Sequence, residues 1–256
     1  MQIPMEAKID SDGLLYIDND IFKKHPLNLN EIKINEDKKI KNYFYELEST
    51  SDYIIKYSIN SLNGYNLINM LLKFQKIKDK IKEIDFPIGY YLEGSHIKGE
   101  IIKYYKDSYS LYYLSEIRDI NILSKYYYHD DDSIHNLYLL MLDILELIEK
   151  LYEENVYYRD IHRGNFIISN NDVKLIDFDY NYIYFKEKKD KNLLRTILSN
   201  YEDLFFILNK RFNLGELVPY NTNSFDTMKN HVKKIENKVR KGFVNGIWKR
   251  RVINRG

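Results

Sequence analysis

Three polar side chains within one short stretch have the types and the spacing that phosphoryl transfer requires. Asp160 is followed five positions later by Asn165, and Asp177 comes twelve residues after that, within YYRDIHRGNFIISNNDVKLIDFDY (157–180). A carboxylate in a tight loop can orient an attacking hydroxyl, and carboxamide and carboxylate oxygens are hard ligands of the kind that Mg²⁺ prefers. The stretch therefore predicts that Asp160 faces a hydroxyl while Asn165 and Asp177 hold a metal ion.

The segments on either side of this stretch predict elements that can hold it in place. Residues 135–155 are apolar over most of a helical circumference, which predicts a buried helix with Asn155 as its C-terminal cap. The runs FIIS and VKLIDF flank an Asn-Asn-Asp turn signal and predict a hairpin. Residues 192–212 predict another helix or helix pair. The polar residues would thus lie in a loop between a buried helix and a hairpin.

The first 105 residues predict a small sheet with one helix inserted before its fourth strand. Lys56 lies in the middle of the third expected strand. Strands give way to helices near residues 103–106, so we expect an α+β protein with an N-terminal lobe at 1–103 and a mainly helical lobe at 104–256. The expected strands are 31–34, 40–47, 53–59, 88–94 and 98–105, and the expected helix is 65–84.

Composition restricts the class of protein. A chain of 256 residues can form one large domain or two lobes that share a cleft. The absence of cysteine excludes disulfides and thiolate zinc sites, and a net charge of +1 gives no overall attraction to nucleic acid or membrane. No run of 18 uncharged apolar residues occurs and the first residues lack a secretory pattern, so we expect a cytoplasmic protein without a membrane span.

The order of these motifs resembles that of the protein kinases. RDIHRGN followed by LIDFD is similar to the catalytic loop H-R-D-x-x-x-x-N and the metal-binding D-F-G, and the order of expected elements agrees over roughly residues 30–210. The resemblance implies a bilobal fold with a small antiparallel sheet and one helix in the first lobe. It also implies an ATP- and Mg²⁺-dependent phosphotransferase in which Asp160 is the catalytic base, and Asn165 and Asp177 bind Mg²⁺.

The resemblance also implies a nucleotide site in the first lobe. Lys56 would contact the α and β phosphates of ATP. The segment IIKYY implies Ile102 as the gatekeeper residue, with the backbone of Lys103 to Tyr105 reading the adenine. A lysine in this position usually pairs with a glutamate of the inserted helix, and the candidates here are Gln75 and Glu83. Glu83 lies close to the end of that helix, and Gln75 would pair without charge.

Several positions depart from the protein-kinase pattern. Tyr158 stands where the pattern has histidine, and Asp179 replaces the glycine of D-F-G, which adds another candidate metal ligand. The expected phosphate-covering loop, NEDKK (35–39), contains no glycine, so Lys38 or Lys39 would have to replace the usual backbone amides. No A-P-E motif follows Asp179, which argues against regulation by phosphorylation of an activation loop.

These departures leave three functions open. We expect a compact protein Ser/Thr kinase, because the YIIK strand and the IIKYY hinge are typical of that organisation. The pairing of D-x-H-x-G-N, with His162 and Gly164, and I-D-F-D is also similar to aminoglycoside and choline phosphotransferases, which act on small molecules. His162 is itself expected to buttress the loop. A kinase-fold binding module with impaired catalysis is the third alternative.

The C-terminal tail is strongly basic. Residues 226–256 hold ten Lys or Arg against Asp226 and Glu236. We expect part of this tail to form a helix. A basic helix can contact nucleic acid or an anionic substrate, although a helix that is simply exposed to solvent explains the pattern equally well.

Overall fold

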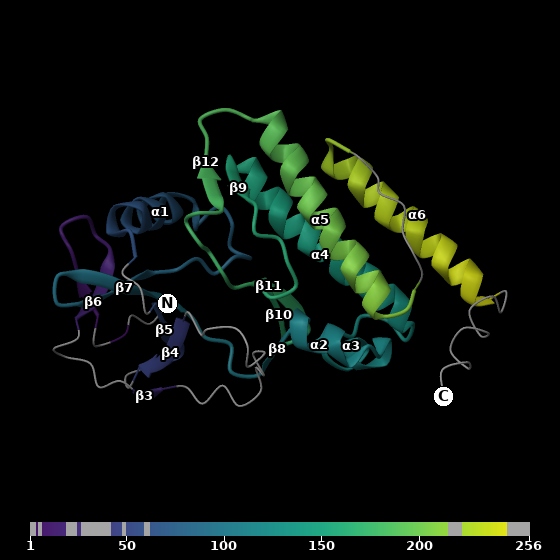
Figure 1. The fold of residues 1–256 in the computed structure, drawn as a ribbon, viewed down its shortest axis with the longest axis horizontal. Helices are drawn as coiled ribbons and strands as arrows, with labels where there is room; N and C mark the ends of the chain where they lie inside the picture. The colour runs from purple at the N-terminus through teal and green to yellow at the C-terminus, as the bar shows by residue number, and fades with distance from the viewer. Residues whose placement is uncertain are drawn as a thin grey trace. The chain divides into compact units, whose positions relative to one another are not determined.

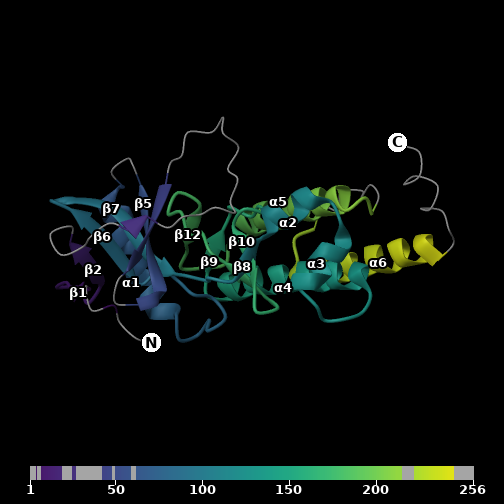
Figure 2. The same cartoon turned by 90° about the horizontal axis from the view of Figure 1, so that it is seen from below.

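The computed structural model describes residues 4, 7–18, 25–26, 42–47, 50–58, 62–214 and 222–244. The chain divides into two compact units, Met1–Lys106 and Asp107–Gly256. The first unit carries the sheet and one helix, and the second is mainly helical (Figures 1 and 2). This α+β architecture confirms the fold class expected from the sequence.

A seven-stranded sheet forms the first unit, in the order β1-β2-β6-β7-β5-β4-β3. Its central strands β5, β6 and β7 each carry a run of three buried residues, and buried side chains of the sheet make a core that includes Ile55, Tyr91 and Ile101. The strands are β1 (Lys8–Ile9), β2 (Leu15–Asp18), β3 (His25–Pro26), β4 (Asn42–Leu47), β5 (Thr50–Ser58), β6 (Gly89–Glu93) and β7 (His96–Lys103).

One edge of this sheet differs from the antiparallel arrangement that we expected throughout. β2 pairs with β6 in parallel, with Leu15 opposite Gly89. A Cβ atom at Gly89 would lie 2.2 Å from the Leu15 carbonyl oxygen, so this approach requires glycine. The sheet is therefore mixed, because a strand from the N-terminal lead-in extends it.

The helix of the first unit is shorter than predicted. α1 (Gly64–Ile77) begins at Asn63, whose side chain accepts a hydrogen bond from the backbone of Asn66. The prediction that it continues to residue 84 is wrong. After Ile77 the backbone forms loose turns that still carry Ile81 and Ile84 into the core, so the apolar pattern persists where the helix does not.

The second unit contains five helices and five short strands among its described residues. Figure 1 shows α4, α5 and α6 running side by side. The elements are β8 (Ser108–Ser110), α2 (Leu111–Ile117), α3 (Ile120–Tyr126), α4 (Ser133–Glu153), β9 (Val156–Tyr158), β10 (Phe166–Ser169), β11 (Asp172–Leu175), β12 (Ile183–Phe185), α5 (Lys191–Arg211) and α6 (Phe225–Val244).

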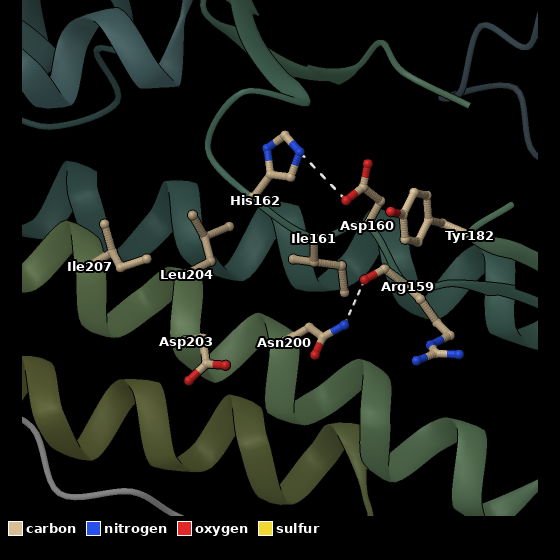
Figure 3. Close-up of a pocket in the computed structure, with 9 residues that line it drawn as sticks. All are labelled: Arg159, Asp160, Ile161, His162, Tyr182, Asn200, Asp203, Leu204 and Ile207. Atoms are coloured by element: carbon tan, nitrogen blue, oxygen red, sulfur yellow. Dashed lines mark hydrogen bonds and ion pairs between the residues drawn. The ribbon is translucent and has the colours of Figure 1, made fainter. Parts of the chain in front are cut away.

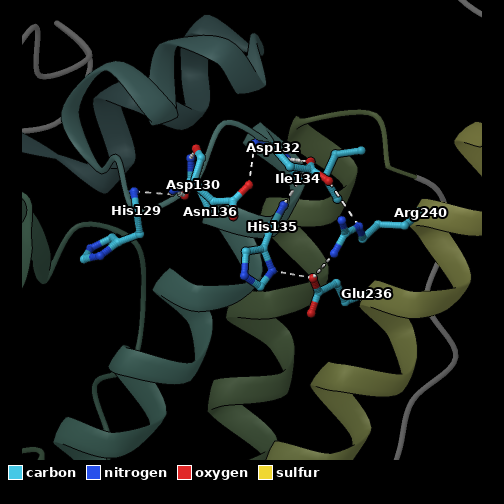
Figure 4. Close-up of polar contacts among 8 residues, drawn as sticks. All are labelled: His129, Asp130, Asp132, Ile134, His135, Asn136, Glu236 and Arg240. Atoms are coloured by element: carbon cyan, nitrogen blue, oxygen red, sulfur yellow. Dashed lines mark hydrogen bonds and ion pairs between the residues drawn. The ribbon is translucent and has the colours of Figure 1, made fainter.

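α4 is the central helix of this unit, as its apolar sequence predicts. The Asp132 side chain caps its first turn, and Asn155 follows its last turn at φ 60°, the left-handed conformation expected of a residue there. The basic tail forms α6, which is fixed to the start of α4 by two contacts (Figure 4). His135 Nδ1 lies 2.5 Å from Glu236 Oε1, and Arg240 Nε lies 3.1 Å from Asp132 Oδ2.

Some expectations fall on residues that the structure does not describe. These are the strand at 31–34, the glycine-free loop at 35–39 with Lys38 and Lys39, and the tail beyond residue 244. Among the described residues, no helix has the length and apolar character needed to cross a membrane.

Candidate functional site

The stretch identified in the sequence forms a loop framed by strands on both sides. β9 enters it and pairs with β12, with Tyr158 opposite Ile183. β10 and β11 leave it as the predicted hairpin, whose turn places Asn170 and Asn171 at positive φ. The loop from 159 to 165 is therefore held at both ends, which limits the positions that its side chains can take.

Asp160 and Asn165 are in direct contact. The Asn165 amide nitrogen donates to the Asp160 backbone oxygen at 2.8 Å and to the carboxylate Oδ2 at 2.9 Å, and it also lies 2.8 Å from the Tyr158 hydroxyl. Asn165 is buried, so these contacts fix the orientation of its amide. Its nitrogen faces Asp160 and Tyr158, and its oxygen is left for another ligand.

Tyr158 links the two predicted metal ligands. Its hydroxyl accepts the hydrogen bond from Asn165 and donates to the backbone oxygen of Asp177 at 2.8 Å. Complete burial, followed by the negative charges of Asp177 and Asp160, raises the pKa of Tyr158 well above its ordinary value, so the phenol stays neutral. The sequence shows only that Tyr158 stands where the protein-kinase pattern has histidine. It does not predict that the Tyr158 hydroxyl bridges Asn165 and Asp177.

His162 lies beside the Asp160 carboxylate (Figure 3). The Gly164 backbone N–H donates to His162 Nδ1 at 3.0 Å, so in the neutral ring the hydrogen is on Nε2. That Nε2 lies 3.5 Å from Asp160 Oδ1. A Cβ atom at Gly164 would lie 3.0 Å from the His162 ring, which explains glycine at this position.

The chemistry of Asn165 and Asp177 fits Mg²⁺. The backbone N–H of Ile176 donates to the Asn165 backbone oxygen at 3.0 Å, which ties the segments of the two ligands together. Asp179, the additional candidate, accepts from the backbone and the side chain of Asn181 through one oxygen and caps the following turn. The described residues contain no group of three or more His, Asp or Glu suited to a metal ion. Two protein oxygens with waters and phosphate is a usual set for Mg²⁺.

The segment after Asp179 folds back onto the loop instead of extending away from it. Tyr182 accepts a backbone hydrogen bond from Arg159 at 3.0 Å, and the Arg159 guanidinium donates to the Tyr184 hydroxyl at 3.2 Å. From α5, the Asn200 amide donates to the Arg159 backbone oxygen at 2.6 Å. β12 and α5 therefore fix the start of the loop at 159–165 from two directions.

A pocket of about 390 Å³ opens next to Asp160, between the loop and α5 (Figure 3). It is lined by Arg159, Asp160, Ile161, His162, Tyr182, Asn200, Asp203, Leu204 and Ile207.

Lys56 lies in β5, third from its end, and its pairing with Gln75 or Glu83 remains a prediction. The Gln75 side chain donates to the Gly13 backbone oxygen at 3.0 Å, and Glu83 lies beyond the end of α1. The residue opposite Lys56 across the β5–β7 pair is Glu100, which is buried. Opposed residues have Cβ atoms only about 4.5–5.5 Å apart.

The segment expected to read adenine follows β7. The Lys103 ammonium lies over the Tyr53 ring, 5.3 Å from its centroid, and the Tyr104 backbone N–H donates to the Asp52 oxygen at 2.8 Å. The Tyr105 hydroxyl donates to the Asp85 carboxylate. Burial and this contact raise the pKa of Tyr105 above its ordinary value. The nucleotide-binding roles of Ile102, Lys103 and Tyr105 remain predictions.

Comparison with known families adds one finding. The model of the WaaY family, described as lipopolysaccharide core biosynthesis protein, matches residues 128–238, from the end of α3 into α6. The match includes all of residues 157–180. No curated protein matches the chain. Together with the fold, the family match confirms the resemblance to the protein kinase-like superfamily and supports a phosphotransferase.

Proposed function

We propose that this protein transfers the γ-phosphate of ATP to a hydroxyl group of a sugar-type acceptor, with Mg²⁺ as the metal cofactor. The observation that carries the proposal is the coincidence of two findings. The segment matched by a lipopolysaccharide core biosynthesis family is the one in which Asn165 fixes the carboxylate of Asp160. A fixed carboxylate beside a pocket is what an incoming hydroxyl requires.

The residues of the second unit have separate roles in this proposal. Asp160 orients the acceptor hydroxyl and takes its proton as the new O–P bond forms and the bond to the departing ADP oxygen breaks. Asn165 and Asp177 would hold Mg²⁺, which when bound neutralises charge on the phosphate oxygens. Tyr158 keeps these two ligands in register. In the first unit, Lys56 would bind the α and β phosphates.

The short connection after Asp179 favours a small acceptor. Only residues 180–190 separate it from α5, and part of this segment is β12, which pairs with β9. One edge of the β12 backbone is thus already paired within the fold. A protein serine or threonine hydroxyl remains the second candidate acceptor, favoured by Lys56 in β5 as in protein-kinase organisation. A cytoplasmic location remains a prediction.

Acceptor classes can be separated by one labelling experiment. The protein would be incubated with Mg²⁺ and γ-labelled ATP, together with either casein or a mixture of neutral monosaccharides. Label in the sugar fraction that depends on Asp160 supports the proposal. Label on casein would transfer the assignment to a protein kinase. If Mg-ATP stabilises the protein thermally but no labelled phosphate is transferred to an acceptor or to water, the protein is the binding module of the third alternative.

A further inference from the structure

The pocket beside Asp160 has two walls of different origin. The catalytic loop forms one wall, and the other is a single face of α5 on which Asn200, Asp203, Leu204 and Ile207 are spaced three or four residues apart. Tyr182 closes a third side. A volume of about 390 Å³ lies within the range of small-ligand pockets and is far below what a folded protein partner would occupy.

These walls carry hydrogen-bond acceptors beside the donors of His162 and Tyr182. Asp160 and Asp203 contribute carboxylates. The Asn200 amide donates one of its two hydrogens to the Arg159 backbone oxygen, which leaves its oxygen and its second hydrogen for a ligand. Figure 3 shows that the Arg159 guanidinium points away from Asp160, and it contacts the Tyr184 side chain. A ligand that contacts the two carboxylates must therefore bring donors of its own, such as hydroxyl groups.

Asp203 differs from Asp160 and Arg159, which also line the pocket, in the absence of a protein partner for its side chain among the described residues. Within the part of the chain that the structure describes, no hydrogen bond or ion pair is found for its carboxylate. The helix positions three and four residues away hold Asn200, Ile207, and other uncharged side chains. A phosphate or carboxylate on a ligand would meet the negative charges of both Asp203 and Asp160, and like-charge contacts are strongly unfavourable in a confined site.

The remaining lining is apolar and accessible. Ile161 and Leu204 are buried, whereas 43% of the Ile207 surface and 46% of the Tyr182 surface are exposed. Exposed apolar side chains next to carboxylates suit a sugar ring, which presents C–H groups on one face and hydroxyls around its edge.

We infer that this pocket is the acceptor site, that it takes a polyhydroxy compound without phosphate or carboxylate groups, and that Asp203 determines this preference. The inference rests on the proposed function. The inference also implies an order of reactions. This protein would have to act on the acceptor before another enzyme adds a phosphate close to the reacting hydroxyl.

The test is an NMR titration of the full-length protein, whose isoleucine methyl groups are labelled. The ligands are glucose, glucosamine and glucose 6-phosphate. Ile161 and Ile207 report on the pocket directly by NMR. Glucose and glucosamine should shift both signals, and glucose 6-phosphate should shift neither at the same concentration. Asp203→Asn should weaken glucose binding roughly three- to tenfold, the effect of one or two lost hydrogen bonds. Asp203→Lys should admit glucose 6-phosphate.

Glu202→Gln is the matched control, because it removes the same charge from the neighbouring position, which does not line the pocket. It should leave all three titrations unchanged. The inference is overturned if no sugar moves the two methyl signals, if glucose 6-phosphate moves them as glucose does, or if Asp203→Asn and Glu202→Gln behave alike. A failure of the proposed function would be detected separately. In that case Mg-ATP would not stabilise the wild-type protein, and the wild-type protein would not hydrolyse ATP.

Discussion

Replacing Tyr158 by phenylalanine tests whether the site is held together through one hydroxyl. The ring would keep its packing, including the edge contact with Phe178 at a centroid distance of 6.0 Å, so no cavity is created. The Asn165 amide would keep two acceptors on Asp160. The Asp177 backbone oxygen would lose its donor in a buried environment. An unsatisfied buried group of this kind costs about 1–3 kcal/mol of unfolding free energy.

Tyr201→Phe provides a matched control for this variant. Tyr201 is also fully buried, and its hydroxyl donates to the backbone oxygen of Met141 at 2.8 Å, outside the catalytic loop. Urea denaturation should give a similar loss of stability for both variants. Only Tyr158→Phe should change the metal requirement, because residues that support metal ligands typically alter metal affinity 10- to 100-fold.

The assay is the Mg²⁺ concentration that gives half of the maximal rate of ATP turnover. We expect it to rise by about tenfold or more for Tyr158→Phe and to stay unchanged for Tyr201→Phe. Equal Mg²⁺ requirements in the two variants would refute the view that Tyr158 aligns Asn165 with Asp177.

Three further predictions follow from individual contacts. Gly164→Ala should push the His162 ring away from Asp160 and lower kcat with little effect on the KM for ATP, and an equal change in both constants would contradict this. Glu100→Gln should weaken Mg-ATP binding if the buried carboxylate orients Lys56, whereas Gln75→Ala should not; calorimetric titration compares them. Burial, then the positive charge of Lys234, lowers the pKa of His231 below 6.5. The unfolded chain therefore binds the proton more readily, so stability should fall as the pH falls through 6.5, and His231→Gln should flatten this dependence in urea denaturation between pH 5 and 8.

Local sequence patterns predicted the parts of the fold that depend on local interactions. The apolar circumference of α4 and the hairpin turn at Asn170 both lie within short windows of sequence. The loop and hairpin of residues 157–180 could be predicted because they are adjacent in the chain.

Features that depend on distant pairing were not predicted. The weak alternation around Tyr16 indicates a short strand, but the parallel register of β2 with β6 depends on a close approach at Gly89. The end of α1 was misplaced because apolar spacing continues through the turns that follow. Glu100 became a candidate partner of Lys56 only through strand register, and the α5 wall of the pocket, with Asp203, became apparent only from the folded structure.

The central claim is that Asp160 acts on the acceptor hydroxyl while Asp177 acts through the metal-bound nucleotide. The most direct measurement compares Asp160→Asn and Asp177→Asn for two properties, thermal stabilisation by Mg-ATP and release of γ-labelled phosphate. We predict that Asp160→Asn keeps the stabilisation and loses roughly 10²- to 10⁴-fold in turnover, and that Asp177→Asn loses both properties. Turnover at the wild-type rate in Asp160→Asn, or full Mg-ATP stabilisation in Asp177→Asn, would contradict the claim.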